Sequence, residues 1–389
     1  MSYRYAVLGA GRQGVAIAYD LAQNGEAEQV LLIDSERAAV AGAVQRLTKL
    51  LPARAGLLRH AVCDVAQPEQ VAMLLQGMNV AVSAVPYRFN VALTDAAISA
   101  RCSLCDLGGN TAVVRGQLER HGRAAKAGVS IVPDCGLCPG LGNHLATHGI
   151  GRMDQPEHVH IRCGGLPERP VGPLGYKLVF NFQGLINEYS GQAEFLRDGR
   201  VTPVATLTEL EAIEFDAPVG PCEAAVTSGG TSTCPQTFAG RLRTYDYKTV
   251  RYPGHFTIVR ALFELGCFDE SVTLRDGTRL APRTLMRQLM EERLAFPNVR
   301  DVVVLRVTVS GRRGANPCTL RYDVFDRHDP ATGFSAMERT TGFPAALVAY
   351  MQARELVEPG ARPLEISVPA ETFYEELPRH GIRVTLCEA

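Results

Sequence analysis

The stretch RYAVLGAGRQGVAIAYDLAQ, residues 4–23, decides the fold of this chain. Its opening, RYAVL, is a short apolar run typical of a buried strand, and its close, GVAIAYDLAQ, is typical of a helix. Between the two lies the glycine pattern GxGxxG at residues 9–14. A strand, a glycine-rich turn and a helix in this order predict a unit that binds the pyrophosphate of a dinucleotide.

Each residue of the glycine pattern has a physical role in such a unit. Gly9 permits the tight turn, Gly11 lets the backbone approach the pyrophosphate, and Gly14 lets the helix pack closely on the strand. The helix N-terminus adds unpaired N–H groups and the positive end of the helix dipole. We therefore assign Gly9, Gly11 and Gly14, with Arg12 and Gln13 between them, to a cofactor site.

Two acids after the following strands extend this site. Asp34 ends the strand LLID twenty residues beyond Gly14, the place of an acid that accepts hydrogen bonds from the ribose hydroxyls. Its charge would repel a 2′-phosphate, so we expect NAD and regard NADP as the less favoured cofactor. The nearby Arg37 could bind a 2′-phosphate and weakens this preference. Asp64, after the third strand, is either a contact to the adenine or a solvated acid.

The first 140 residues continue the alternation of short apolar runs and Ala-rich helical stretches, which is typical of a doubly wound α/β domain with a parallel sheet. After about residue 150 the runs pair like antiparallel strands, and residues 302–326 predict a hairpin. We expect residues 1–142 to form a dinucleotide-binding domain that 336–389 complete, with an α+β domain inserted at 143–335.

Composition excludes several classes of protein. Among 389 residues, 40 Lys and Arg oppose 41 Asp and Glu, which leaves no basic excess to neutralise a nucleic acid. The apolar runs are too short to span a bilayer. Because the N-terminus enters a strand at once, we expect no signal peptide, and we interpret the eleven cysteines as reduced thiols of a cytoplasmic enzyme.

Three strand ends have an unusual composition: residues 83–87, 106–110 and 134–142. Ligands of doubly wound sheets lie beyond the carboxyl ends of the strands. The last segment, DCGLCPGLG, is rich in Gly and Pro and precedes the second domain, so it suits a ligand close to the backbone and a hinge. The alternative is a plain connection between domains.

The sequence resembles the saccharopine dehydrogenase-like oxidoreductases, and within them the lysine 6-dehydrogenase branch. The matching blocks cover essentially the whole chain: GAGRQG, VPYRFN, CDLGGN, DCGLCPGLGN, CGGLP, PLGYK, FNFQGLINEY, EAAVTSGGTST, YDYKTVRYPGH and MERTTGFPAALVAYM. The resemblance implies a split nucleotide-binding domain, an inserted domain at 143–335 that serves substrate binding and dimerisation, and a homodimer. It also implies cofactor contacts from the strand-end loops, which we place at Val85, Pro86, Cys135, Gly136 and Pro139.

The chemistry that the resemblance implies is NAD-dependent oxidative deamination of a side-chain amine, most simply that of lysine. A hydride leaves the ε-carbon, and the imine hydrolyses to an aldehyde and ammonia. Two alternatives stay open: a dehydrogenase or reductase acting on saccharopine or a carboxylated polyamine, and a non-catalytic NAD-binding protein. In each enzymatic case the partner is a small amino acid or amine, with neither a nucleic acid nor a membrane involved.

This chemistry needs a base for the amine and a cation for the carboxylate. We place Arg251 as the carboxylate anchor and Lys248, His255 and Glu223 as candidates for proton transfer. The further candidates for substrate contact are Tyr176, Thr227, Tyr247 and Asp106. Each has a structural alternative: a solvated basic strand, a hydrogen-bonded core histidine, a glycine-rich turn or a solvated strand-end acid.

Two CxxC pairs, Cys102/Cys105 and Cys135/Cys138, invite a zinc or a redox interpretation. Both pairs fall where strands and cofactor-facing loops are expected, and neither opens a helix as in thioredoxin-type motifs. We therefore expect buried thiols and no metal.

Overall fold

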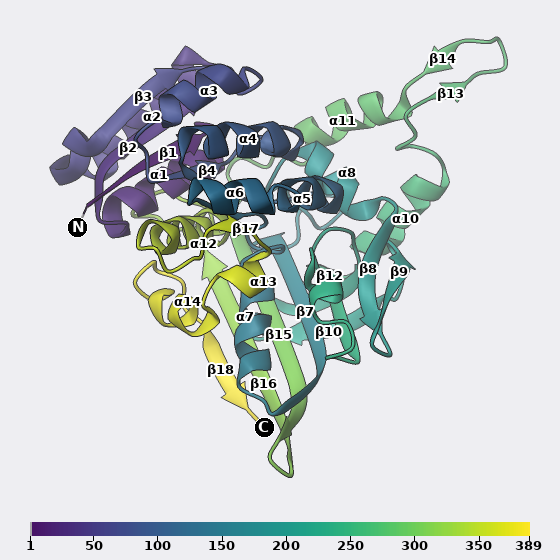
Figure 1. Ribbon diagram of the computed structural model, residues 1–389. Coiled ribbons are helices and arrows are strands. Elements are labelled where there is room, and N and C mark those ends of the chain that lie inside the picture. The colour runs from purple at the N-terminus through teal and green to yellow at the C-terminus, as the bar shows by residue number, and fades with distance from the viewer. Residues whose placement is uncertain (1) are drawn as a thin grey trace.

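The computed structural model describes residues 2–389, and within them a parallel sheet of seven strands forms the first domain (Figure 1). The strand order is β17-β6-β5-β4-β1-β2-β3. The bounds are β1 Tyr3–Leu8, β2 Ala27–Asp34, β3 Leu58–Val62, β4 Val80–Ser83, β5 Ser103–Asp106, β6 Ser130–Val132 and β17 Gly360–Ala361. Strands β4 and β6 are buried along their whole length, as strands covered on both faces must be. The order confirms the predicted doubly wound fold.

Helices cover both faces of this sheet. On one face, α1 (Arg12–Asn24), α2 (Arg37–Leu50) and α12 (Ala336–Ala353) share an apolar core with β1 and β2. On the other face, α3 (Pro68–Leu75), α4 (Asn90–Ala100) and α6 (His121–Ala127) share a second core with the same strands. Helix α5 (Thr111–Leu118) packs against α4.

Helix α12 brings the C-terminal part of the chain back to the first domain, where it packs on α1. Its start is fixed by Ser335, whose side chain accepts from Glu338 N at 3.1 Å. Asp301, from the second domain, accepts from the backbone of Ala336 and Met337, both at 3.0 Å. These bonds satisfy N–H groups that the first turn of a helix leaves without partners.

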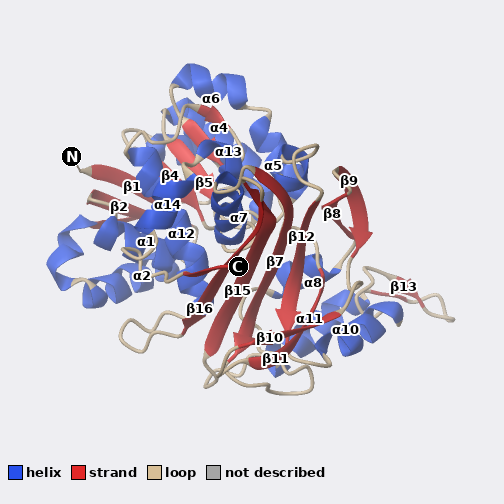
Figure 2. Ribbon diagram, turned by 90° about the horizontal axis from the view of Figure 1, so that it is seen from below, coloured by secondary structure: helices blue, strands red, loops and turns tan. Residues whose placement is uncertain are grey.

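The second domain is built on a mixed sheet of nine strands, best seen from below in Figure 2. Its main path is β10-β11-β12-β7-β15-β16-β18, and the hairpin β8–β9 pairs with β12. The bounds are β7 Gln155–Pro167, β8 Gln192–Arg197, β9 Arg200–Ala205, β10 Glu211–Phe215, β11 Gly220–Val226, β12 Thr244–Arg251, β15 Asp301–Arg313, β16 Asn316–Arg327 and β18 Thr385–Glu388. Strands β15 and β16 are the predicted hairpin, which is thereby confirmed.

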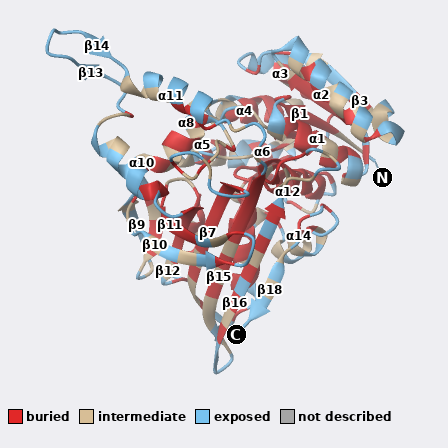
Figure 3. Cartoon of the chain, turned by 180° about the vertical axis from the view of Figure 1, so that it is seen from behind, coloured by how far each residue is buried: buried red, intermediate tan, exposed pale blue. Residues whose placement is uncertain are grey.

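Helices and one projecting arm complete the second domain. The helices are α7 Leu141–Gly151, α8 Phe182–Tyr189, α9 Cys234–Thr237, α10 His255–Glu264, α11 Pro282–Arg293, α13 Leu364–Ser367 and α14 Ala370–Glu376. Between α10 and α11 the chain runs out into the small hairpin β13 (Val272–Thr273) and β14 (Arg279–Leu280), which projects from the body and is exposed throughout (Figures 1 and 3). Within residues 2–389, no helix is both long and apolar enough to cross a membrane.

One expectation for the C-terminus needs correction. Strand β17 extends the first sheet beside β6, but the terminal strand β18 pairs with β16 in the second sheet. Helix α14 likewise packs mainly on α7. The edge of β16 offers unpaired backbone groups, and residues 385–388 satisfy them. The last residues therefore do not pack on the first domain as expected.

The hydrogen bonds by which Asp301 caps α12 should contribute measurably to the free energy of unfolding. Asp301→Ala removes two charge-assisted hydrogen bonds to a helix N-terminus, so we expect the free energy of unfolding to fall by about 2 kcal/mol. Urea denaturation followed by circular dichroism measures the change. Asp276→Ala, in the exposed turn of the arm, is the control and should leave the midpoint unchanged. A loss for Asp301→Ala no larger than for the control would contradict the role of this cap.

Candidate active site

A cavity of about 570 Å³ lies between the two domains. Its first wall is made of the predicted strand-end loops, with Ala84, Val85 and Pro86 after β4, Leu107, Gly108 and Gly109 after β5, and Leu137, Cys138 and Pro139 after β6. Its second wall comes from α8 and β12, with Asn187, Glu188, Tyr247, Thr249 and Arg251. Gln13 of the glycine turn and Met337 of α12 also line it. The cavity therefore lies where a doubly wound fold binds its ligands.

The glycine turn fits a dinucleotide. A Cβ atom on Gly14 would lie 1.8 Å from the carbonyl oxygen of Gly9, so only glycine lets α1 start this close to β1. Gly9 has a φ of +102°, and a Cβ there would lie 2.9 Å from Ala84 O. A Cβ on Gly11 would contact nothing within 4 Å, which leaves open space above the turn. Within the described residues no side chain caps α1, so its first N–H groups are available to a phosphate.

The two side chains within the turn tie it to α12. Arg12 donates to Glu338 at 3.2 Å, to Ser335 Oγ at 3.1 Å and to Val179 O at 3.2 Å. Gln13 donates to Met337 O at 3.2 Å and faces the cavity. Arg12 therefore links the cofactor turn to both domains through its side chain.

The two predicted acids at strand ends accept hydrogen bonds from backbone groups. Asp34 accepts from Ala10 N at 2.8 Å through Oδ2 and from Glu36 N at 3.0 Å through Oδ1. Asp64 accepts from Ala66 N at 2.9 Å and closes a turn. Asp34 thus fixes the glycine turn, and the exposed side chains beside it are Ser35, Glu36 and Arg37. No ion pair engages Arg37 among residues 2–389.

Asp106 lies behind the cavity wall and shapes it. Its Oδ1 accepts from Gly108 N at 2.8 Å, and its Oδ2 accepts from Gln117 at 2.8 Å. The side chain is fully buried, and this burial raises its pKa. Cys135 and Gly136 are also behind the wall, whereas Val85, Pro86 and Pro139 face the cavity. Asp106 is therefore placed to hold the loop after β5 rather than to contact a substrate.

Strand β12 divides its predicted residues between two faces. Tyr247, Thr249 and Arg251 point into the cavity. Lys248 points the other way, where its Nζ donates to Glu211 Oε2 and to Glu209 O, both at 2.7 Å. Successive side chains of a strand lie on opposite faces, so Lys248 and Arg251 cannot serve one site. The position of Lys248 does not support proton transfer in this cavity.

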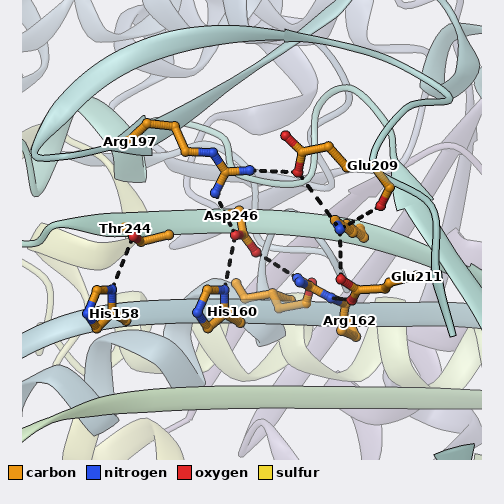
Figure 4. Close-up of polar contacts among 10 residues, drawn as sticks. His158, His160, Arg162, Arg197, Glu209, Glu211, Thr244 and Asp246 are labelled. Carbon is orange, nitrogen blue, oxygen red and sulfur yellow. Dashed lines mark hydrogen bonds and ion pairs between the residues drawn. The ribbon is translucent and has the colours of Figure 1, made fainter. Parts of the chain in front are cut away.

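Through Glu209 and Glu211, Lys248 joins a charged cluster on the outer face of the sheet. Figure 4 shows this cluster around Asp246. At its centre, Asp246 accepts from Arg162 at 2.7 Å, from Arg197 at 2.8 Å and from His160 at 3.0 Å. Burial raises the pKa of Asp246, but these partners outweigh it and hold the pKa well below its usual range. The cluster is a self-contained network of ion pairs. Among residues 2–389, no three His, Cys, Asp or Glu side chains are arranged to hold a metal ion.

Two other predicted catalytic residues hold the structure behind Arg251. Glu223 accepts from Gly254 N at 3.0 Å and Phe256 N at 2.7 Å, which caps α10. His255 contacts Leu174 O through Nδ1 at 3.0 Å and the Tyr189 hydroxyl through Nε2 at 2.9 Å. Burial and the charge of Arg251 lower the pKa of His255 to about 3, so the ring is neutral. Neither residue is among those that line the cavity.

Arg251 is held on several sides and faces the cavity. Its Nε donates to the Tyr189 hydroxyl at 3.0 Å, and its Nη1 donates to Val250 O at 2.9 Å. The ring of Tyr176 lies under the guanidinium, 4.7 Å from it. Tyr176 is thus a support for Arg251. Thr227 reaches the cavity only through Thr249, with 2.7 Å between their hydroxyl oxygens.

The residue that sequence reasoning missed is Glu188, at the end of α8. It lines the cavity, its side chain is 30% exposed there, and its Oε2 lies 3.6 Å from Nη2 of Arg251. Among the described residues, Oε2 has no hydrogen-bond partner. Burial raises the pKa of Glu188 to about 7 despite the charge of Arg251. The sequence feature that could have identified Glu188 is that it is the acid within the matching block FNFQGLINEY. Only the folded structure shows that it faces Arg251.

Comparison with known proteins adds to this geometry. Residues 5–132 match the family model of the saccharopine dehydrogenase NADP binding domain, and residues 136–382 match that of the saccharopine dehydrogenase C-terminal domain. The chain is 28% identical over 201 residues to saccharopine dehydrogenase [NADP(+), L-glutamate-forming] of Pyricularia oryzae, a match that covers 48% of this chain and 42% of that one. It is 25% identical over 149 residues to the Saccharomyces cerevisiae protein of the same name, over 37% and 33% of the two chains. The matches thus span less than half of either relative.

A solved structure shares the fold over its whole length. Apo saccharopine dehydrogenase (L-Glu forming) from Saccharomyces cerevisiae superimposes with a TM-score of 0.78 at 20% identity, covering 100% of both chains. At this identity the likeness establishes the architecture of both domains.

The predicted preference for NAD over NADP is wrong. The matching nucleotide-binding model is an NADP binding one, and both curated relatives are named for NADP(+). The prediction treated Asp34 as a free carboxylate, but its two oxygens already accept backbone N–H groups of the turn. Backbone donors offset part of its charge, and the exposed Ser35 and Arg37 beside it supply donors of the kind that a phosphate binds.

The two family models together cover most of the chain, and the solved structure shares its fold from end to end. Both findings fit the cavity that lies between the glycine turn and the buried Arg251. The chain belongs to the saccharopine dehydrogenase family of oxidoreductases.

Proposed function

We propose that this protein is an NADP-dependent dehydrogenase that oxidises the carbon–nitrogen bond of a small amino acid. The observation that carries the proposal is the position of Arg251, a buried guanidinium that faces the strand-end loops across the cavity. A planar guanidinium with free N–H groups is the preferred protein partner of a carboxylate. It therefore suits the carboxylate of an amino acid whose amine reaches the cofactor side.

The charge of the cavity favours a substrate with one carboxylate and an amine. Of the described residues that line it, Arg88 and Arg251 are basic and Glu188 is acidic. Arg88 is exposed and lies over the ring of Phe89, so Arg251 is the cation buried in the wall. Substrates with three carboxylates would leave charges without partners. Lysine or a close relative, oxidised at its side-chain amine, matches this balance.

The overall reaction is then R–CH2–NH3+ + NADP+ + H2O → R–CHO + NADPH + NH4+ + H+, with the nicotinamide accepting the hydride when it is bound. The chain contributes orientation and exclusion of water. Arg251 fixes the carboxylate end of the substrate, and the loops after β4, β5 and β6 form the opposite wall. A substrate held at its carboxylate end by Arg251 and confined by the loops on the opposite wall has its reacting carbon aligned with the cofactor side.

Residues at two places would hold the cofactor. The turn at residues 9–14 and the first N–H groups of α1 suit the pyrophosphate. Ser35 and Arg37, exposed beside Asp34, suit the 2′-phosphate.

A second candidate follows from the names of the relatives. Both curated relatives are glutamate-forming saccharopine dehydrogenases, so oxidation of a secondary amine to an aldehyde and glutamate is the alternative reaction. The two reactions differ in their nitrogen product, which is ammonia in the first case and glutamate in the second.

We also propose that the chain forms a homodimer. The arm, the end of α10 before it and helix α11 after it carry exposed apolar side chains, among them Leu265, Leu274, Leu280 and Leu285, and such a surface is of the kind that a second chain covers. Light scattering should report twice the mass of one chain, and a single-chain mass at micromolar concentration would contradict this.

The cofactor assignment predicts a selective effect of Arg37. Arg37→Ala removes a charged partner of the 2′-phosphate, so we expect NADPH to bind about tenfold more weakly while the affinity for NADH stays within about twofold. Titration calorimetry with each nucleotide measures both constants. Arg275→Ala, in the exposed arm, is the matched control. Equal losses for both nucleotides would show that Arg37 does not contact the 2′-phosphate.

The substrate assignment predicts opposite outcomes for two basic residues of β12. Arg251→Lys keeps the charge and loses the planar fork, so the KM for lysine should rise at least about tenfold. Lys248→Met, on the other face of the strand, should change kcat/KM by less than about threefold. Absorbance of reduced nicotinamide with lysine and NADP+ measures both. A larger loss for Lys248→Met than for Arg251→Lys would contradict the assignment.

A further inference from the structure

We propose that Arg251 and Glu188 together form a clamp for the head group of an α-amino acid, in which Arg251 binds the carboxylate and Glu188 binds the α-ammonium group. The clamp rests on the proposed function and narrows its substrate class. The site would take a free α-amino acid by its head group and present the far end of the side chain to the cofactor.

The first support is the spacing of the two charges. Glu188 Oε2 lies 3.6 Å from Nη2 of Arg251, which is longer than a direct hydrogen bond. Both side chains line the same cavity. In an α-amino acid the carboxylate and the ammonium are attached to one carbon, so they are about a hydrogen-bond length apart. Two adjacent protein charges of opposite sign match that pair of groups in both sign and spacing.

The second support is that both groups have hydrogen-bonding capacity left. Arg251 is 2% exposed, and its hydrogen bonds engage Nε and Nη1. Across residues 2–389, no hydrogen bond engages its Nη2 or either carboxylate oxygen of Glu188; Oε2 is buried beside Arg251, whereas Oε1 is not among the buried oxygens and is the one that a ligand in the cavity can reach. A buried cation beside a partly buried acid is costly when their donors and acceptors have no partners. A zwitterion bound in the cavity against this pair would give hydrogen-bond partners to both side chains.

The third support is the absence of a competing charge beside the pair, within the part of the chain that the structure describes. The other titratable groups that face Glu188 are Tyr247 from β12, Tyr176 from the segment after β7, Tyr189 from α8 and Cys138 from the interdomain loop. Burial raises the pKa of each of these groups, so all four are neutral near pH 7. When Glu188 is ionised, the pair is therefore balanced by charge and suits a ligand head group that is balanced as well.

The clamp has one rival, in which Glu188 accepts the proton of the reacting amine. A base acts on every substrate, whereas an ammonium partner acts only on substrates that carry a second nitrogen. Removing single groups from the substrate separates the two roles.

The experiment compares wild type and Glu188→Gln with three substrates and NADP+. Lysine has both head-group charges, 6-aminohexanoate lacks the α-ammonium, and pentane-1,5-diamine lacks the carboxylate. We expect Glu188→Gln to lower kcat/KM for lysine and for the diamine by about 10- to 100-fold, chiefly through KM. For 6-aminohexanoate the change should stay within about threefold. A similar loss with all three substrates, carried by kcat, would overturn the clamp and favour the base.

Controls separate the clamp from folding. Glu209→Gln replaces a glutamate of the charged cluster on the outer face of the sheet, away from the cavity, and should leave all three substrates unchanged. Glu188→Gln should keep the melting temperature and the NADPH affinity of wild type. Glu188→Asp, which retains the charge on a shorter side chain, should recover part of the preference for lysine over 6-aminohexanoate.

The pH profile gives a second readout. A carboxyl with a pKa raised to about 7 is ionised above that pH and neutral below it. The ratio of kcat/KM for lysine to that for 6-aminohexanoate should therefore fall as the pH drops from 8 to 6, while the deprotonation of the reacting amine cancels in the ratio. A ratio independent of pH in wild type would count against the clamp.

Binding of a ligand that cannot react keeps this test independent of the proposed function. If wild type oxidises none of the three substrates, the proposed function fails, and calorimetry with norleucine and hexanoate in the presence of NADPH still tests the clamp. Tighter binding of norleucine, lost in Glu188→Gln, would support it. Equal binding of the two ligands to wild type would overturn it.

Discussion

The burial of one guanidinium organises the substrate side of this protein. Arg251 carries a full charge with 2% of its side chain exposed, which is costly unless partners surround it. Tyr189 and Val250 O accept its hydrogen bonds, and the ring of Tyr176 lies beneath it. His255 in turn holds Tyr189, and Glu223 caps the helix on which His255 lies. Residues of α8, α10, β11 and the segment after β7 are thus arranged so that one buried charge can face the cavity.

The cofactor side follows a different constraint, the close approach of α1 to β1. Gly14 permits that approach, and Asp34 fixes the turn by accepting from Ala10 N. Arg12 then ties the turn to Glu338 at the start of α12. Asn187 donates to the Tyr87 hydroxyl at 2.9 Å and joins α8 to the loop after β4. The two halves of the cavity are therefore held together by contacts at its rim, which positions a carboxylate anchor opposite the strand-end loops.

The sequence predicts the elements well where the signal is local. Apolar runs that are buried on both faces and the glycine turn predict the doubly wound sheet, and residues 302–326 predict the hairpin of β15 and β16. The place of β18 depends on a free strand edge far away in the chain, which no local pattern reveals. Arg251 and Tyr247 line the cavity, whereas Lys248 lies on the other face of β12, because the face that turns inward is set by the neighbouring strands β7 and β11. Glu188 was missed because its position opposite Arg251 depends on how α8 packs beside β12. Asp34 led to the wrong cofactor preference because its hydrogen bonds to the backbone are seen only in the folded structure.

The central claim is that Arg251 anchors the carboxylate of an amino acid that extends toward the cofactor loops. The most direct measurement is a crystal structure of the protein with NADPH and norleucine. The account predicts the carboxylate within hydrogen-bond distance of Arg251, the α-nitrogen beside Glu188 and the side chain directed at the loops after β4, β5 and β6. An amino acid bound with its carboxylate away from Arg251, or outside this cavity, would contradict the account.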